Sequence, residues 1–414
     1  MVVGGAADFI FYGGHIVTMD DEYPTAEALA TQDGKILAVG GKNDVFFHGG
    51  DDTKYISLEG NQTLLPGFIE AHTHGIGATV SRCLNVNCSG YYYQSYAQIK
   101  DLFRKTIANV DREKGKWCIF DGWDPELIED LPDLNWDILD EYSCDIPILV
   151  IGQNMHIAWA NHKAFEIAGI MEDTKDPDGG FFVRDPETKK LTGQMMEPPT
   201  YRMFRDSAPT PTHEEMAKAL DDQWDEYARC GFTTITDLLF TPNQFDSLLD
   251  GIIEEKSLEV ECPLRMAVYY CFEGLRKTDV QEPVTKQKKV KVFLDENDKL
   301  WFQGVKIITD GSPHCGSIAS RDPFLENTLT QRLGFPPSPS YGVLNYSDDE
   351  LLKMVKEWHD KGKQVAIHAH GERAIDQVLN VYEKVKTHVC YAIWERVSKV
   401  LLVFINRLNI KFIL

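Results

Sequence analysis

Two histidines at alternate positions are the residues of this chain best suited to bind a metal ion. His72 and His74 follow the apolar run Gly67 to Ala71, which is typical of a buried strand. Residues i and i+2 of a strand point to the same face, so the two imidazoles would lie side by side at its end. A bare pair of this kind also fits two surface histidines in a loop, but the strand that leads into it favours a divalent metal site.

A third histidine ends a similar run later in the chain. His368 follows the short apolar run Val365 to Ile367, and barrel enzymes place their catalytic side chains at the carboxyl ends of such strands. Taken alone, His368 fits a satisfied core histidine as well as a metal ligand. The presence of His72 and His74 makes the ligand interpretation the better one.

A lysine lies inside another apolar run. Lys306 is flanked by Val305 and Ile307, and a buried ammonium group is costly unless it is paired or modified, because it loses its hydration. Carbamylation by CO₂ would turn Lys306 into an anionic bridge between two metal ions. An ion pair with Asp310 or Asp237 fits the spacing equally well.

Three polar residues are weaker candidates for contacts with a substrate. His156 and Asn161 lie in a stretch rich in Pro and Asp, where they could line a pocket or form a structural turn. Asp310 follows the run that holds Lys306, so its carboxylate could orient a ligand or cap a helix. Each of the three therefore has a structural alternative.

The elements that would position these residues change in character along the chain. Residues 8–65 are rich in β-branched and aromatic residues separated by Gly-Gly and Asp-Gly turns, which predicts a small β unit over residues 1–65 with a hairpin of residues 28–31 and 36–39. From residue 66 to 386, five apolar strand-like runs alternate with helical patterns. This alternation predicts an α/β layered fold or barrel.

Helix starts and two irregular stretches complete the predicted organisation. Two pairs have the spacing of a capping box: Ser347 with Glu350, and Thr212 with Glu215. We interpret the Pro- and Asp-rich stretch at about 115–210 as an insertion between the first and second core strands, which could wall a pocket. The charged stretch at about 277–300 predicts a solvated hairpin.

Composition and charge exclude several classes of function. The 414 residues carry a formal charge of −22, which excludes nucleic-acid binding through a basic surface. No apolar run approaches the ~20 residues of a membrane span, and no Lys or Arg precedes Lys35, so we expect neither a signal peptide nor a membrane partner. Nine scattered cysteines without a CxxC pair favour a reduced, cytoplasmic compartment.

Six blocks of sequence together resemble the metal-dependent amidohydrolase superfamily, and within it amidohydrolase family 3, the YtcJ-like group. The blocks are LLPGFIEAHTHG at 64–75, HIAWANHKAFEIAGI at 156–170, GGFFVRD at 179–185 followed by LTGQMMEP at 191–198, GFTTITD at 231–237, GVKIITDGSPHCGSIA at 304–319 and QVAIHAHGERAID at 364–376. They stand in the family's order, and the similarity spreads over about residues 8–386. Six ordered blocks are far more specific than any one of them.

The resemblance implies a TIM-like (β/α) barrel of the metallo-dependent hydrolase type, which has eight strands in the family and a metal centre at their carboxyl ends, beside a small β-sandwich. With only five core strands, we expect the barrel over residues 66–386 to be partial and incomplete at its C-terminal end. His72 and His74 match the ligands of the first strand, Lys306 matches the lysine of the fourth strand, and His368 matches the histidine of the fifth. They would hold one or two divalent ions, expected to be zinc. The family's sixth-strand histidine, in an RIEH-type block, and its proton-carrying eighth-strand aspartate have no matching motif in this sequence.

The resemblance also implies an activity and sets apart the end of the chain. The activity would be hydrolysis of a carbon–nitrogen bond, other than a peptide bond, in a small amide, with a homodimer as the expected assembly. A catalytically inactive fragment is the alternative, and an esterase or isomerase using the same site is another.

Residues 387–414 hold one acidic and four basic residues and lie outside the family pattern. We interpret them as a translated intron or a frame error, or alternatively as a natural short form with an amphipathic end helix.

Overall fold

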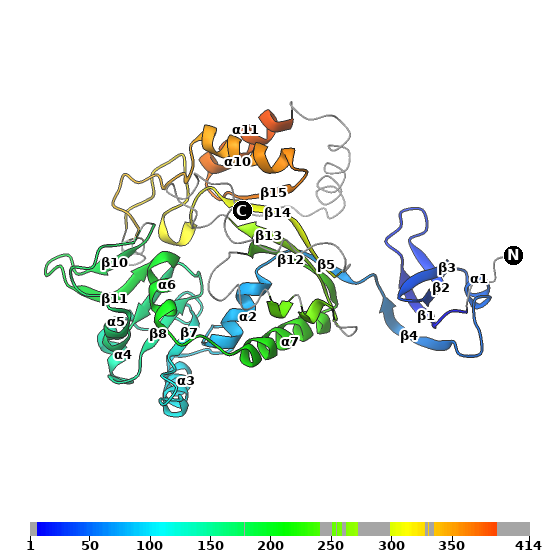
Figure 1. Ribbon diagram of the computed structural model, residues 1–414, viewed down its shortest axis with the longest axis horizontal. Helices are drawn as coiled ribbons and strands as arrows, with labels where there is room; N and C mark the ends of the chain where they lie inside the picture. The colour runs from blue at the N-terminus through cyan, green and yellow to red at the C-terminus, as the bar shows by residue number, and fades with distance from the viewer. Residues whose placement is uncertain are drawn as a thin grey trace. The chain divides into compact units, whose positions relative to one another are not determined.

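The computed structural model describes residues 6–177, 179–240, 251–253, 255–258, 262–271, 299–327, 330 and 335–386 (Figure 1). The chain falls into two compact units, Met1–Ile69 with Arg229–Thr234 and Glu70–Ala228 with Ile235–Leu414. Nearly all of the expected hairpin at about 277–300, and the whole of the expected tail at 387–414, lie outside the described residues. None of the helices described is long and apolar enough to cross a bilayer.

The N-terminal unit is built on a four-stranded sheet in the order β3-β2-β1-β4. Its strands are β1 (Phe9–Val17), β2 (Thr25–Gln32), β3 (Lys35–Gly40) and β4 (Lys54–Leu64), and the short helix α1 (Lys42–Phe46) follows β3. Asp33 and Gly34, at φ 51° and 71°, form the two-residue turn between β2 and β3. The predicted hairpin is therefore confirmed, whereas the second layer of a β-sandwich stays a prediction.

The strands that carry the predicted metal ligands form a five-stranded sheet in the order β15-β14-β13-β12-β5. They are β5 (Phe68–Thr73), β12 (Phe232–Phe240), β13 (Arg265–Cys271), β14 (Leu300–Ile308) and β15 (Gln364–His368). β14 pairs in parallel with both β13 and β15. All five strands predicted from apolar runs are therefore present.

Helices pack against this sheet through apolar faces. α10 (Asp348–Asp360) and α11 (Glu372–Lys386) bury Leu351, Val355 and Val381 with Val305 and Ile307 of β14. The predicted capping box of α10 is present, because Ser347 and Glu350 exchange backbone and side-chain hydrogen bonds. The same reciprocal bonds join Thr212 and Glu215 at the start of α7 (His213–Arg229).

A second sheet occupies the chain between β5 and β12. Its six strands run in the order β10-β11-β9-β8-β7-β6 and are β6 (Asn85–Asn87), β7 (Cys118–Trp123), β8 (Ile148–Gly152), β9 (Ile157–Ala160), β10 (Phe181–Arg184) and β11 (Leu191–Met196). Every residue of β8 and β9 is buried. The stretch expected as an insertion at about 115–210 is thus part of a sheet with its own core, and that sheet begins earlier, at β6.

Five helices accompany this second sheet. They are α2 (Gly75–Leu84), α3 (Tyr96–Asn109), α4 (Trp136–Asp140), α5 (His162–Ala168) and α6 (Pro198–Ser207). Phe103 of α3 stacks on Phe120 of β7 with ring centroids 4.0 Å apart, and Phe165 of α5 contacts Phe204 of α6. The second contact holds α6, the helix that begins directly after Glu197, a polar residue of the site described below.

Candidate metal centre

His72 and His74 lie together where β5 leads into α2. His72 is the fifth residue of the six-residue strand Phe68–Thr73, and His74 is the N-cap residue of α2. The chain therefore leaves the strand one residue before His74, yet the two imidazole centroids are 5.4 Å apart, with the ring planes at 83°. The prediction that the two side chains share one place at the end of the strand is consistent with this geometry.

The surroundings of the two rings favour their neutral form. Partial burial lowers the pKa of His72, and the nearby Lys306 ammonium acts in the same direction. Partial burial also lowers the pKa of His74 to about 4, with further lowering from His72, Lys306 and His368. Because a metal binds the neutral imidazole, both side chains are in the ligating state at neutral pH. The charges that act on His74 come from the other three predicted ligands.

Lys306 and His368 are contributed by the adjacent parallel strands β14 and β15. The Lys306 side chain is almost fully buried between the fully buried Val305 and Ile307, and His368 pairs in register with Ile308. Burial lowers the pKa of His368, although its contact with the Gly311 carbonyl opposes the effect. His368 Nε2 lies 3.3 Å from that carbonyl oxygen.

The two carboxylates considered as partners of Lys306 are both bonded to backbone N–H groups. Asp310 accepts hydrogen bonds from Ala319 N at 3.0 Å, His370 N at 3.0 Å and Gly371 N at 2.7 Å. The last two bonds hold the segment between His368 and α11, which is a structural role for Asp310. A contact of Asp310 with a ligand stays a prediction. Asp237 accepts from Ile76 N at 2.7 Å, and burial raises its pKa to about 6.

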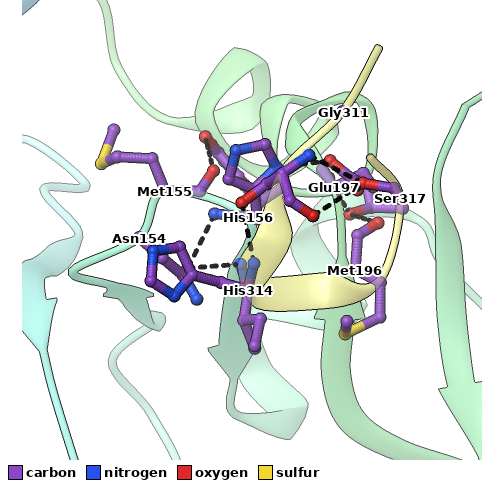
Figure 2. A network of polar contacts seen from close by, with 12 residues as sticks. Asn154, Met155, His156, Met196, Glu197, Gly311, His314 and Ser317 are labelled. Carbon is purple, nitrogen blue, oxygen red and sulfur yellow. Dashed lines mark hydrogen bonds and ion pairs between the residues drawn. The ribbon is translucent and has the colours of Figure 1, made fainter. Parts of the chain in front are cut away.

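His156 belongs to a polar network that joins the second sheet to the loop after β14 (Figure 2). Its Nδ1 lies 2.7 Å from Glu197 Oε2, and the other carboxylate oxygen, Oε1, lies 3.3 Å from Ser317 Oγ. Ser317 Oγ also accepts a hydrogen bond from Ser312 N at 2.9 Å. Sequence reasoning did not select Glu197 or Ser317, although both lie within blocks that carry the family resemblance.

Asn161 corrects the prediction of a substrate contact. Its side chain is fully buried, and Oδ1 accepts hydrogen bonds from Ala164 N and Ile148 N, both at 3.0 Å. Its Nδ2 donates to the carbonyls of Ser143 at 2.8 Å and Ile146 at 2.9 Å. The whole amide is occupied by backbone groups, so Asn161 is the N-cap residue of α5 and the structural alternative is the right one.

The donors suit a divalent ion in their chemistry. Within the ranges that the structure describes, no group of three or more His, Cys, Asp and Glu side chains is placed to hold one ion. The case for a metal therefore depends on two adjacent imidazoles that stay neutral, a third from His368, and the buried amine of Lys306, which as a carbamate would add oxygen ligands.

The chain matches the model of the amidohydrolase family over residues 55–395. This match starts later than the predicted similarity at about residue 8 and ends beyond its predicted limit at about 386. A metal-dependent hydrolase of Pyrococcus horikoshii OT3 has the same fold, with a TM-score of 0.63 at 20% identity over 91% of this chain and 68% of its own. The predicted fold class is thus confirmed as a metal-dependent hydrolase fold.

Three curated relatives resemble the chain along most of its length. Protein LONG AFTER FAR-RED 3 of Arabidopsis thaliana is 28% identical, over 92% of this chain and 62% of its own length. The YtcJ protein of Bacillus subtilis (strain 168) is 26% identical over 91% and 66%, and the N-substituted formamide deformylase of Arthrobacter pascens is 21% identical over 92% and 66%. The chain spans roughly two thirds of the length of each of these relatives. Because the family model covers most of the sequence, this chain belongs to the amidohydrolase family.

Proposed function

We propose that this chain provides the metal centre of a hydrolase that cleaves a carbon–nitrogen bond, other than a peptide bond, in a small amide. The observation that carries the proposal is the adjacent pair of imidazoles of His72 and His74. Burial and the charge of Lys306 lower the pKa of both rings, and His368 lowers that of His74 further. The relative named N-substituted formamide deformylase supports an amide, and specifically an N-substituted formamide, as the substrate class.

Each residue of the centre has a defined part in this proposal. His72, His74 and His368 would hold a divalent ion, expected to be zinc, and Lys306 as a carbamate would bridge to a second ion. The bound metal would supply a Lewis acid for the amide carbonyl and a water of lowered pKa. The lowered imidazole pKa values keep the ligand lone pairs available. Asp310 fixes the segment that follows His368 through its bonds to His370 and Gly371.

A chain without a metal is the second candidate, and one observation favours it. The described residues contain no group of three or more His, Cys, Asp and Glu side chains that is placed to hold an ion. In that case the chain would be catalytically inactive and would act, if at all, as a binding partner. An esterase or an isomerase that uses the same site is a further candidate, and its reaction products would distinguish it from an amide hydrolase.

Product analysis tests the main proposal directly. The purified chain, supplied with zinc, is assayed on a panel of N-formyl and N-acyl amines and on the corresponding esters. We expect release of the amine, and we expect His72→Ala with His74→Ala to abolish it. A matched control is His15→Ala with His213→Ala, because both of these histidines are exposed. Cleavage of esters alone, or of no substrate in the panel, would contradict the proposal.

A further inference from the structure

Glu197 adopts a backbone conformation that an ordinary residue rarely occupies. Its φ of 71° and ψ of 148° fall in a region that is costly for any residue with a Cβ atom, and such residues cluster at functional sites. Its amide N–H donates to the carbonyl of His156 at 2.6 Å, and its own carbonyl accepts from Thr200 N at 3.1 Å. Met155, next to His156, also has a positive φ, of 62°. The backbone therefore has an unfavourable conformation on both sides of the His156–Glu197 contact, at Met155 and at Glu197 itself.

The contact fixes which nitrogen of His156 carries a proton. A carboxylate can only accept a hydrogen bond, so the Nδ1 that lies 2.7 Å from Glu197 Oε2 must be the protonated nitrogen. In a neutral ring, Nε2 is then an acceptor. Among the described residues, none forms a hydrogen bond with Nε2, and the side chain keeps 27% of its surface exposed. Nε2 is therefore open to a ligand that offers an N–H or O–H group.

This acceptor is linked to the candidate metal centre by one loop. Glu197 Oε1 contacts Ser317 Oγ, and Ser317 packs so closely on Gly311 that a Cβ atom there would lie 2.1 Å from the Ser317 hydroxyl oxygen. The Gly311 carbonyl in turn contacts His368 Nε2. Figure 2 shows His156 and Glu197 beside Gly311, His314 and Ser317 of this loop.

We propose that His156 recognises the substrate by accepting a hydrogen bond from its amide N–H, and that Glu197 is the positioning residue that keeps Nε2 an acceptor. This inference rests on the proposed function and deepens it, because it names secondary amides, which carry an N–H, as the preferred substrates over tertiary amides. The proposal also gives a functional explanation for the costly backbone conformation of Glu197.

Nitrogen-15 NMR of histidine-labelled chain tests the orientation of the ring without any substrate. The His156 signals are identified by their loss in His156→Gln. We expect a proton on Nδ1 and none on Nε2 in the wild type, and loss of this fixed state in Glu197→Gln, whose amide can donate to Nδ1. Glu187→Gln is the matched control, since Glu187 is an exposed residue of the same sheet region and should leave the signals unchanged. A proton on Nε2 of the wild type would overturn the proposal.

Binding of two probes tests the recognition step. N-butylformamide has the amide N–H, and N-methyl-N-butylformamide lacks it. We expect the wild type and Glu187→Gln to bind the first about fivefold more tightly, as for one neutral hydrogen bond, and Glu197→Gln to lose the preference. A preference that persists in Glu197→Gln would be steric and would overturn the proposal, as would equal binding or binding of neither probe. Selective binding without hydrolysis would instead reject the proposed function and leave this inference standing.

Discussion

His74 stays neutral in the folded chain at pH values where an ordinary histidine is protonated. Partial burial lowers its pKa to about 4, with His72, Lys306 and His368 contributing in the same direction. Between a pH of about 6.5 and 4 the unfolded chain therefore binds more protons than the folded chain. The stability linked to His74 is complete above this window and is lost as the pH falls through it. Because His74 is only partly buried and keeps an exposed surface, screening by solvent limits the effect to about 1 kcal/mol.

Replacing His74 should remove this part of the pH dependence. We expect the free energy of unfolding of His74→Gln to fall less than that of the wild type between about pH 7 and about pH 5, by about 1 kcal/mol. The measurement is urea unfolding of both proteins at the two pH values with a metal chelator present. Identical losses of stability in the two proteins would show that His74 titrates normally in the fold.

Lys306 offers a second prediction at the residue scale, because a carbamate can be replaced chemically. We expect Lys306→Ala to lose at least about tenfold in amide hydrolysis and to regain activity when a short carboxylic acid such as acetate or propionate is added. The measurement is the hydrolysis rate of wild type and variant at increasing acid concentration. Full activity of the variant without added acid would remove Lys306 from the site.

At the scale of elements, Asp310 stabilises the fold by joining segments that are distant in the sequence. Its fully buried carboxylate joins the end of β14 to Ala319 and to the start of α11 through three backbone hydrogen bonds. We expect Asp310→Ala to lower the free energy of unfolding by about 3 kcal/mol, since it leaves buried N–H groups without an acceptor. Urea unfolding measures this, with Asp173→Ala at an exposed position as the control. A loss of stability as small as that of Asp173→Ala would show that Asp310 does not hold these segments together.

The capping box of α10 gives a smaller and equally specific effect. The Ser347 side chain accepts a hydrogen bond from Glu350 N, and the Glu350 side chain accepts from Ser347 N at 2.9 Å. We expect Ser347→Ala to cost about 1 kcal/mol in the free energy of unfolding and Ser347→Asp to retain most of it, because aspartate keeps the acceptor. Equal destabilisation by both substitutions, measured by thermal unfolding, would show that the hydroxyl acts in some other way.

The sequence predicted the strands that have a clear local pattern of residues. It missed the sheet whose strands depend on their pairing with one another. β5, β12, β13, β14 and β15 were found because each contains a short apolar run, the pattern of a parallel strand buried on both faces. The expected burial is wrong for β5, most of whose residues are exposed. The second sheet was taken for an insertion, since its first strand, β6, has only three residues and owes its place to pairing with β7. A strand of that length carries too little pattern to predict from sequence.

The residues of the candidate site differ in the same way: some have a local sequence signal and others do not. His72, His74 and His368 were selectable because each follows an apolar run, and Lys306 because it lies inside one. Glu197 was not, because its importance comes from a backbone conformation that residue type does not reveal, and from a contact with Ser317 120 positions away. Asn161 was over-interpreted, since residue type alone does not distinguish a helix cap from a ligand contact.

At the scale of the whole molecule, the family and the fold agree with the sequence blocks. The family match over residues 55–395 includes every predicted metal ligand, and the shared fold with the Pyrococcus horikoshii hydrolase covers 91% of this chain. Because the chain spans 62% of the first of the curated relatives, the activity of the whole protein remains a proposal. The homodimer and the β-sandwich likewise stay predictions.

The metal content of the purified chain tests the central claim most directly. Elemental analysis after exposure to zinc and removal of free metal would compare the wild type with His72→Ala combined with His74→Ala, using circular dichroism to verify that both are folded. We predict at least one zinc ion per wild-type chain and essentially none in the variant. Wild-type chain without stoichiometric metal, or a folded variant that retains as much zinc as the wild type, would contradict the assignment of this metal centre.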